Sequence, residues 1–194
     1  MSLYRIIPSP DLIDFNSWDI DDEKLSSFEI INNYEEVIKN TKLSAAFLQE
    51  LATDDILDFF DSLATYWLTD PKRSFLKLFS RIGVSFLISF IRRQNLEMLM
   101  KQSLYGNIYH LDRFIESTNL KKKLMAHPQG VITHWLAGNV PVLGMISLIQ
   151  GLVTKNTNVI KLPRENGVVL PLMLNEIAKH SFSNSEKQLM DRIL

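Results

Sequence analysis

Asn139 has a side chain and a position that could give it a catalytic role. It lies between an apolar run at residues 131–136 and an apolar stretch at residues 141–153, a pattern that predicts a strand, a turn and a helix. A side-chain amide at that turn could donate a hydrogen bond to a developing oxyanion at the carboxyl end of a sheet, where open α/β proteins bind ligands. The position also suits an asparagine that caps the N-terminus of the helix. The residues alone leave both roles open.

The other residues that could act as ligands or nucleophiles show no site pattern. Glycine-rich phosphate motifs, the zinc-protease motif and the nucleophile elbow are absent from the sequence. Ser147 falls within the expected helix with no paired base nearby, which argues against a nucleophile. Four histidines lack metal-ligand spacing, and two of them, His127 and His134, are interpreted as polar strand residues. The chain has no cysteine, so these residues offer neither a thiolate ligand nor a cysteine nucleophile.

Strands and helices are expected to alternate around Asn139. The expected strands are residues 124–126, 131–136 and 158–161, and the expected helices are residues 141–153, 168–179 and 185–194. A turn at Pro128 and Gly130 precedes the second strand, and Pro141 falls in the first turn of the helix after Asn139. Two strands joined through a helix by a right-handed crossover are parallel. The pattern therefore implies an open α/β sheet.

The first 120 residues are expected to be mainly helical. Residues 1–28 mix prolines, acidic residues and isolated apolar anchors, which predicts an irregular arm. From residue 32 to residue 120 apolar residues recur at intervals of three and four, as in Ile56, Phe59, Phe60 and Leu63. Asp54 is the expected N-cap of that helix. Pro71 is expected to open a long helix with an apolar face, which ends near Asn95; the face comprises Phe75, Leu78, Phe79, Ile82 and Phe86.

The composition is that of an ordinary globular protein, and the charge is divided unevenly along it. Apolar residues make up 46% of the chain and charged residues 22%, which excludes disordered and collagen-like proteins. Residues 1–70 carry 15 acids and 4 bases, whereas residues 71–194 carry 7 acids and 17 bases. The two halves either neutralise each other at an internal interface, or the second half holds a polyanionic ligand. Nucleic acid is not an expected partner, because the basic residues are dispersed apart from residues 121–123.

The sequence indicates no signal peptide and no membrane span. Residues 1–10 lack a basic region followed by an apolar run. The most apolar stretch, residues 82–91, is about half as long as the ~20 residues that a spanning helix needs. We therefore expect a cytoplasmic protein.

Residues 128–165 resemble the cofactor-domain core of the aldehyde dehydrogenase superfamily. The positions at the family spacing are Pro128, Gly130, Asn139, Pro141, Asn156 and Lys161. The departures are Ala137 and Gly138 in place of Pro-Trp, Lys155 in place of a glycine, and Leu162 and Pro163 in place of Pro-Ser. With these departures the segment is similar to the acyl-CoA reductases of the bacterial bioluminescence type. Those enzymes reduce a fatty acyl thioester with NADPH to a long-chain aldehyde.

The resemblance implies roles for three residues. Asn139 matches the asparagine that stabilises the oxyanion, and Lys161 matches the lysine that hydrogen-bonds the adenosine ribose. Arg164 stands where relatives that prefer NAD carry a glutamate, and an arginine there would favour the 2′-phosphate of NADPH. Arg164 could equally be a solvated loop residue paired with Glu165. The implied partners are a fatty acyl-CoA or an acyl-protein thioester, and a homo-oligomer is expected.

The resemblance also implies a fold and a domain organisation. We expect an aldehyde-dehydrogenase-like α/β protein, with a helix-rich segment at residues 1–120 and an incomplete Rossmann-like parallel sheet at residues 121–194. The catalytic cysteine and the glycine-rich segment for the pyrophosphate are missing. The chain is therefore expected to be an N-terminal part of the reductase that is inactive by itself. The alternative is a non-enzymatic helical interaction module with a strand, helix, strand tail, whose acidic half binds a basic partner.

Overall fold

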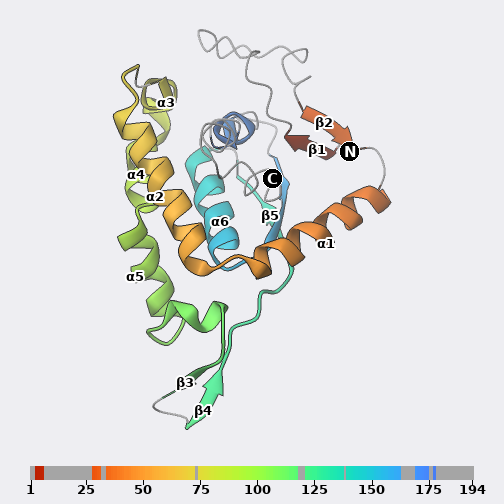
Figure 1. Cartoon of the computed structure of the whole chain (residues 1–194). Helices are drawn as coiled ribbons and strands as arrows, with labels where there is room; N and C mark the ends of the chain where they lie inside the picture. Colours follow the sequence, from red (N-terminus) through yellow and green to blue (C-terminus); the bar gives the residue numbers. More distant parts are fainter. Residues whose placement is uncertain are drawn as a thin grey trace.

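The computed structural model describes residues 3–6, 28–31, 34–72, 74–117, 121–137, 139–162, 169–174 and 177. A group of helices occupies one side and a two-stranded parallel sheet lies beside it (Figure 1). The helices are α1 (Tyr34–Glu50), α2 (Thr53–Thr69), α3 (Ser74–Leu78), α4 (Val84–Phe90), α5 (Arg93–Ser103) and α6 (Pro141–Val153), with short 3-10 helices at Ser80–Ile82 and Ile108–Leu111. The strands are β1 (Leu3–Ile6), β2 (Phe28–Ile31), β3 (Ile115–Ser117), β4 (Lys122–Leu124), β5 (Val131–Trp135) and β6 (Thr157–Lys161).

Helix α2 lies at the centre of the helical group. It buries one apolar face, which confirms the expected helix through Ile56, Phe59, Phe60 and Leu63. Near its end the Trp67 ring stacks on Phe75 with the ring centroids 3.7 Å apart. The prediction that Asp54 caps the helix is wrong, because Ala52 occupies the N-cap and makes no side-chain cap hydrogen bond.

The long helix expected from Pro71 is interrupted. Pro71 lies in a turn, and the chain then forms α3, a 3-10 helix and α4 in succession. Gly83 ends the 3-10 helix with φ of +83°, a left-handed conformation that glycine adopts without a steric penalty. The interruption rotates the apolar face, so that Phe75 and Phe79 are buried but Phe86 is exposed. The next break falls at residues 91–92 rather than near Asn95, because α5 already begins at Arg93.

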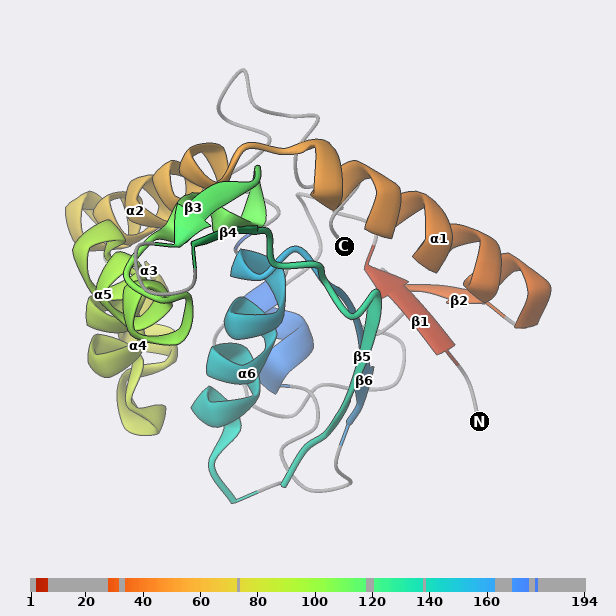
Figure 2. The same ribbon diagram turned by 90° about the horizontal axis from the view of Figure 1, so that it is seen from below.

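The strand, helix, strand unit formed by β5, α6 and β6 is present. Strands β5 and β6 are parallel, with register pairs running from Val131↔Thr157 to Trp135↔Lys161. Helix α6 has the expected bounds, begins on Pro141, and packs against both strands and against α2 and α4. In Figure 2, α6 lies on one side of the two strands and α1 on the other. An α/β architecture is thus established for this unit.

Other expected elements fare differently. The strand expected at residues 124–126 is wrong, because β4 ends at Leu124 and pairs antiparallel with β3 in a hairpin that projects from the molecule (Figure 1). Residues 169–174 are helical, as expected within 168–179, whereas residues 185–194 lie outside the described residues. The irregular arm expected at residues 1–28 is wrong for Leu3–Ile6, which pairs with β2.

Acids of the first half pair with bases of the second half. Arg92 contacts Asp61 at 3.1 Å, and Arg93 binds both Asp54 and Asp58. These ion pairs favour the first alternative for these residues, in which acids of residues 1–70 are neutralised by bases of residues 71–194. No helix among the described residues is both long enough and apolar enough to cross a membrane.

Candidate functional site

The site expected from the sequence lies at the carboxyl edge of β5 and β6. The two strands end opposite each other, since Trp135 is the register partner of Lys161. The pairing extends one residue further, because the Leu136 N–H donates to the Lys161 carbonyl at 3.4 Å. The chain then turns through Asn139 into α6, which begins at Pro141. The turn that carries Asn139 therefore follows directly from the edge that carries Lys161.

Asn139 does not cap the helix that follows it. The N-cap of α6 is Val140, and no side chain makes a cap hydrogen bond there. Asn139 is exposed, and its amide forms no hydrogen bond with any of the residues that the structure describes. The amide donors therefore remain available to a ligand at this edge of the sheet.

Lys161 is half-buried at the end of β6. Its Nζ lies 5.2 Å from the centroid of the Trp135 ring, a cation–π contact. Within the described ranges, no carboxylate forms an ion pair with it. Its ammonium can thus donate to a hydroxyl or a phosphate. Arg164 and Glu165 lie outside the described residues.

Gly130 and Asn156 hold the opposite end of the two strands together. The Asn156 Oδ1 accepts a hydrogen bond from the Gly130 N–H at 3.0 Å, and the Thr157 N–H donates to the Gly130 carbonyl at 2.9 Å. Gly130 has φ of +99°, which favours glycine. Asn156 is buried, and its amide N–H group donates to Thr154. These two positions of the sequence pattern therefore have a structural function, which is to fix the start of the parallel pair.

The sequence profile described as acyl-CoA reductase (LuxC) matches residues 48–193. The chain belongs to this family. It is similar to the long-chain acyl-protein thioester reductase of Aliivibrio fischeri, with 29% identity over 124 residues, which cover 57% of this chain and 26% of that protein. It is also similar to the long-chain acyl-protein thioester reductase of Vibrio harveyi, with 25% identity over 130 residues, 60% of this chain and 27% of that protein. The chain spans about a quarter of the length of these curated relatives. No solved structure matches it.

In this LuxC-family protein, three hydrogen-bonded side chains connect β5, α6 and β6. The His134 Nδ1 lies 2.8 Å from the Ser147 Oγ, and its Nε2 lies 2.7 Å from the Asn158 Oδ1. The Asn158 amide nitrogen donates to the Asn156 carbonyl, so its oxygen faces the histidine. In a neutral imidazole, that orientation assigns the proton to Nε2 and lets Nδ1 accept from the serine hydroxyl.

This arrangement corrects one interpretation of the sequence, because Ser147 does have a base beside it. The interpretation of His134 as a polar strand residue is confirmed, since it lies within β5, where it is buried and hydrogen-bonded. The signal was available in the register, because His134 lies on the α6 face of β5 and Ser147 is central in α6. Buried polar groups need partners, and these three satisfy one another. We interpret the group as a crosslink within the LuxC-family unit.

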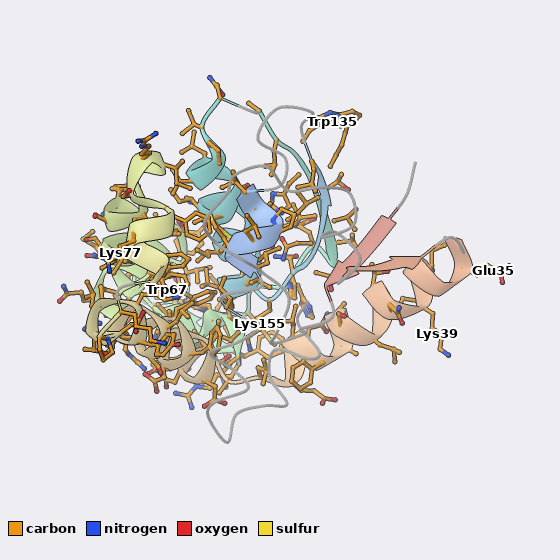
Figure 3. The ribbon with its side chains drawn as sticks, turned by 90° about the horizontal axis from the view of Figure 1, so that it is seen from above. Glu35, Lys39, Trp67, Lys77, Trp135 and Lys155 are labelled. Carbon is orange, nitrogen blue, oxygen red and sulfur yellow. The ribbon has the colours of Figure 1, made fainter. Side chains whose placement is uncertain are left out.

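Lys155, which stands where the related pattern has glycine, is buried and has φ of +60°. Its Nζ donates to the Leu51 carbonyl and to the Asp112 carboxylate, both at 2.6 Å. Asp112 also accepts from the Thr53 N–H at 3.1 Å and from the Thr53 hydroxyl at 2.7 Å, so it caps α2 from a distance. Figure 3 shows Lys155 far from Glu35 at the start of α1, and its partner Leu51 follows the end of α1 and precedes α2. Sequence reasoning missed this contact, since its partners lie 43 and 104 residues away.

The described histidines offer no metal site. His110 is buried, and its Nδ1 lies 3.0 Å from the Leu124 carbonyl, which fixes the start of the chain segment after β4. His127 is exposed, and His180 lies outside the described residues. Among the described residues no group of three or more histidine, aspartate or glutamate side chains could hold a metal ion.

Proposed function

We propose that this chain forms the N-terminal part of an NADPH-dependent reductase that converts a long-chain fatty acyl thioester to an aldehyde. The substrate is either an acyl-CoA or an acyl-protein thioester. Family membership and the names of both relatives support this reaction. One observation carries the proposal. The Asn139 amide is exposed and does not cap α6, and it follows the strand edge that carries Lys161.

In this proposal Asn139 stabilises the oxyanion. Reduction of a thioester passes through a tetrahedral intermediate whose oxygen carries negative charge. A neutral, fixed N–H donor stabilises that charge without needing to be deprotonated or reorganised. Removal of one such donor typically raises the barrier by ~2.7–4 kcal/mol.

Lys161 and Arg164 are proposed to hold the adenosine side of the cofactor. The donor chemistry fits, because Lys161 offers three N–H donors at the strand edge and Arg164 adds a guanidinium three residues later. When bound, NADPH would supply the two electrons of the reduction. The residues of this chain would orient the ribose and its phosphate.

Other parts of the proposal concern the complete protein. The 194 residues contain no cysteine, so the nucleophile that receives the acyl group would be supplied elsewhere in the protein. By itself the chain is proposed to be inactive. A cytoplasmic location, a homo-oligomer, and the division into residues 1–120 and 121–194 stay predictions.

The test is aldehyde formation by the complete protein that contains this chain. The purified protein is incubated with a long-chain acyl-CoA and NADPH, the aldehyde is identified by gas chromatography, and NADPH consumption is followed by its absorbance. The expected result is one NADPH oxidised for each aldehyde formed, because the reduction of a thioester to an aldehyde takes two electrons. A control without acyl-CoA should consume no NADPH. Absence of aldehyde from both acyl-CoA and acyl-protein substrates would favour the interaction module instead.

A further inference from the structure

A large aromatic side chain lies exposed beside Lys161. Trp135 ends β5 and is 77% exposed, although tryptophan is among the residues whose burial stabilises a protein most. Its register partner is Lys161, whose ammonium lies 5.2 Å from the ring centroid. In Figure 3, Trp135 projects from the end of its strand, away from Lys155 and Trp67.

The β5 side chains on the face that carries Trp135 are exposed, although α1 contacts β6 on the same side of the sheet. Side chains alternate between the faces of a strand, and His134 points towards α6. Trp135 therefore lies on the opposite face, together with Val131 and Thr133, which are also exposed. The small side chains leave the indole accessible at the carboxyl end of the sheet.

An indole beside a lysine at this place suits one class of ligand. The flat aromatic surface can stack on a heterocyclic base. Such stacking does not depend strongly on which base is present, because every base has a π-face. The ammonium can contact a ribose hydroxyl or a phosphate on the same ligand. An acyl chain would use the apolar surface but not the charge, so the pair favours a nucleotide over a lipid.

We propose that Trp135 is a base-stacking residue, which packs against the adenine of an adenosine 2′-phosphate nucleotide while Lys161 contacts its ribose or phosphate. This inference rests on the proposed function, because it takes the Lys161 edge as the cofactor site. It adds a binding residue and assigns the adenine to the face of β5 opposite α6. The cation–π contact places the Lys161 ammonium over one face of the indole, 5.2 Å from its centroid, so the base would stack on the other face.

The test measures binding of 2′,5′-ADP to the 194-residue chain. Binding is expected in the millimolar range, since the pyrophosphate segment is missing, and is measured by ligand-observed NMR. Alanine substitution of a stacking residue typically weakens binding about 5- to 150-fold, so Trp135→Ala should weaken it at least fivefold. Trp135→Phe keeps an aromatic face and should bind with intermediate strength. Ribose 5-phosphate, which has no base, should bind wild type and Trp135→Ala equally.

Two controls separate stacking from a general effect. Tyr105→Ala removes another highly exposed aromatic residue and should leave binding unchanged. In a Trp18→Phe background, tryptophan fluorescence should be quenched by 2′,5′-ADP, and adding Trp135→Phe should abolish that quenching, since the remaining Trp67 is buried.

Equal affinity of wild type and Trp135→Ala for 2′,5′-ADP would overturn the inference, as would absence of binding to wild type. Equal losses for 2′,5′-ADP and ribose 5-phosphate would also overturn it, because they would indicate a site without stacking. Aldehyde formation by the complete protein is assayed separately. A reductase that retains that activity while this inference fails would leave the proposed function standing.

Discussion

At the scale of single residues, Lys155 combines two features that each cost free energy. A left-handed backbone at a residue other than glycine costs roughly 1–2 kcal/mol, and a buried ammonium must be fully paired. The contacts with Leu51 and Asp112 meet the second requirement. Breaking a buried pair from one side typically costs about 3–5 kcal/mol, so the pairing outweighs the backbone strain.

We predict that Lys155→Gly destabilises the chain although it relieves the backbone strain. The expected loss in the free energy of unfolding is about 1–3 kcal/mol, and Lys155→Met, which keeps the strain, should lose more. Urea unfolding followed by circular dichroism measures both. The matched control is Lys121→Gly, because Lys121 also has a positive φ but is exposed; this variant relieves the same strain without breaking a buried pair and should not lower stability. A Lys155→Gly variant as stable as the wild type would contradict the prediction, because the buried pair would then contribute no more than the backbone strain costs.

A second residue-scale prediction concerns cofactor choice. In the complete enzyme, Arg164→Glu should lower the ratio of kcat/KM for NADPH to that for NADH at least tenfold. The reason is that a charge-assisted contact with the 2′-phosphate is lost and a repulsive carboxylate is introduced. The effect should shrink as salt is raised. A ratio within about twofold of the wild type would indicate that Arg164 is a solvated loop residue.

At the scale of elements, close approach of α6 to β6 depends on Gly151. A Cβ at that position would lie 2.0 Å from the Asn158 Oδ1. The amide cannot swing aside freely, because it is bonded to His134 and to the Asn156 carbonyl. The glycine and the three-residue crosslink are therefore parts of one helix–strand contact.

We predict that Gly151→Ala and Asn158→Ala are strongly non-additive. Gly151→Ala should lower the free energy of unfolding by about 1–3 kcal/mol through the steric conflict. Asn158→Ala removes the conflicting atom, so the double variant should be about as stable as Asn158→Ala alone. A double-mutant cycle from urea unfolding measures the coupling. Simple additivity would show that the two positions do not meet.

Helices α2 and α5 are joined by charged side chains around Arg93. Hydrogen bonds with Asp58 and Asp54 raise the pKa of Arg93 above its ordinary value, so it stays charged. Hydrogen bonds from Lys101 and then Arg93 lower the pKa of Glu97 below its ordinary value of 4.5, against an opposing contribution from burial.

The lowered pKa of Glu97 predicts a pH dependence. Its charged form is favoured in the folded state, so its contribution is present above pH 4.5 and is lost as pH falls through the lowered pKa. At neutral pH, Glu97→Gln should therefore be less stable than wild type by about 0.5–1 kcal/mol. The difference should shrink in acid, as measured by urea unfolding at several pH values. A difference that stays constant from neutral to acid pH would contradict this role.

Some elements could be predicted from sequence and others could not. Helix α6 has the expected bounds because Pro141 begins it and its apolar residues are continuous. The helix predicted from Pro71 is longer than the helices observed, because periodicity alone does not reveal that Gly83 adopts a left-handed conformation.

The candidate site shows the same division. The position of Lys161 at a strand end followed from local pattern, whereas the Lys155 and His134 contacts depend on residues distant in sequence. Such tertiary contacts cannot be read from periodicity.

At the scale of the whole molecule, the helical segment and the parallel pair share one hydrophobic core. Helices α2 and α4 both pack on α6, and buried residues from these helices form a single cluster. The Lys155 contacts and the hydrogen bond from the Thr157 hydroxyl to the Thr41 carbonyl add polar links to α1 and α2. This packing anchors the parallel pair, whose carboxyl edge carries Asn139 and Lys161.

The central claim is that this edge supplies an oxyanion donor to an acyl reductase, and the most direct test is the turnover of Asn139→Ala in the complete enzyme. Gln150→Ala removes an exposed amide from α6 and serves as the matched control, with unchanged kcat expected. Asn139→Ala should lower kcat for acyl-CoA reduction about a hundredfold or more, while the Kd for NADPH stays near that of the wild type. A kcat within twofold of the wild-type value would contradict the account.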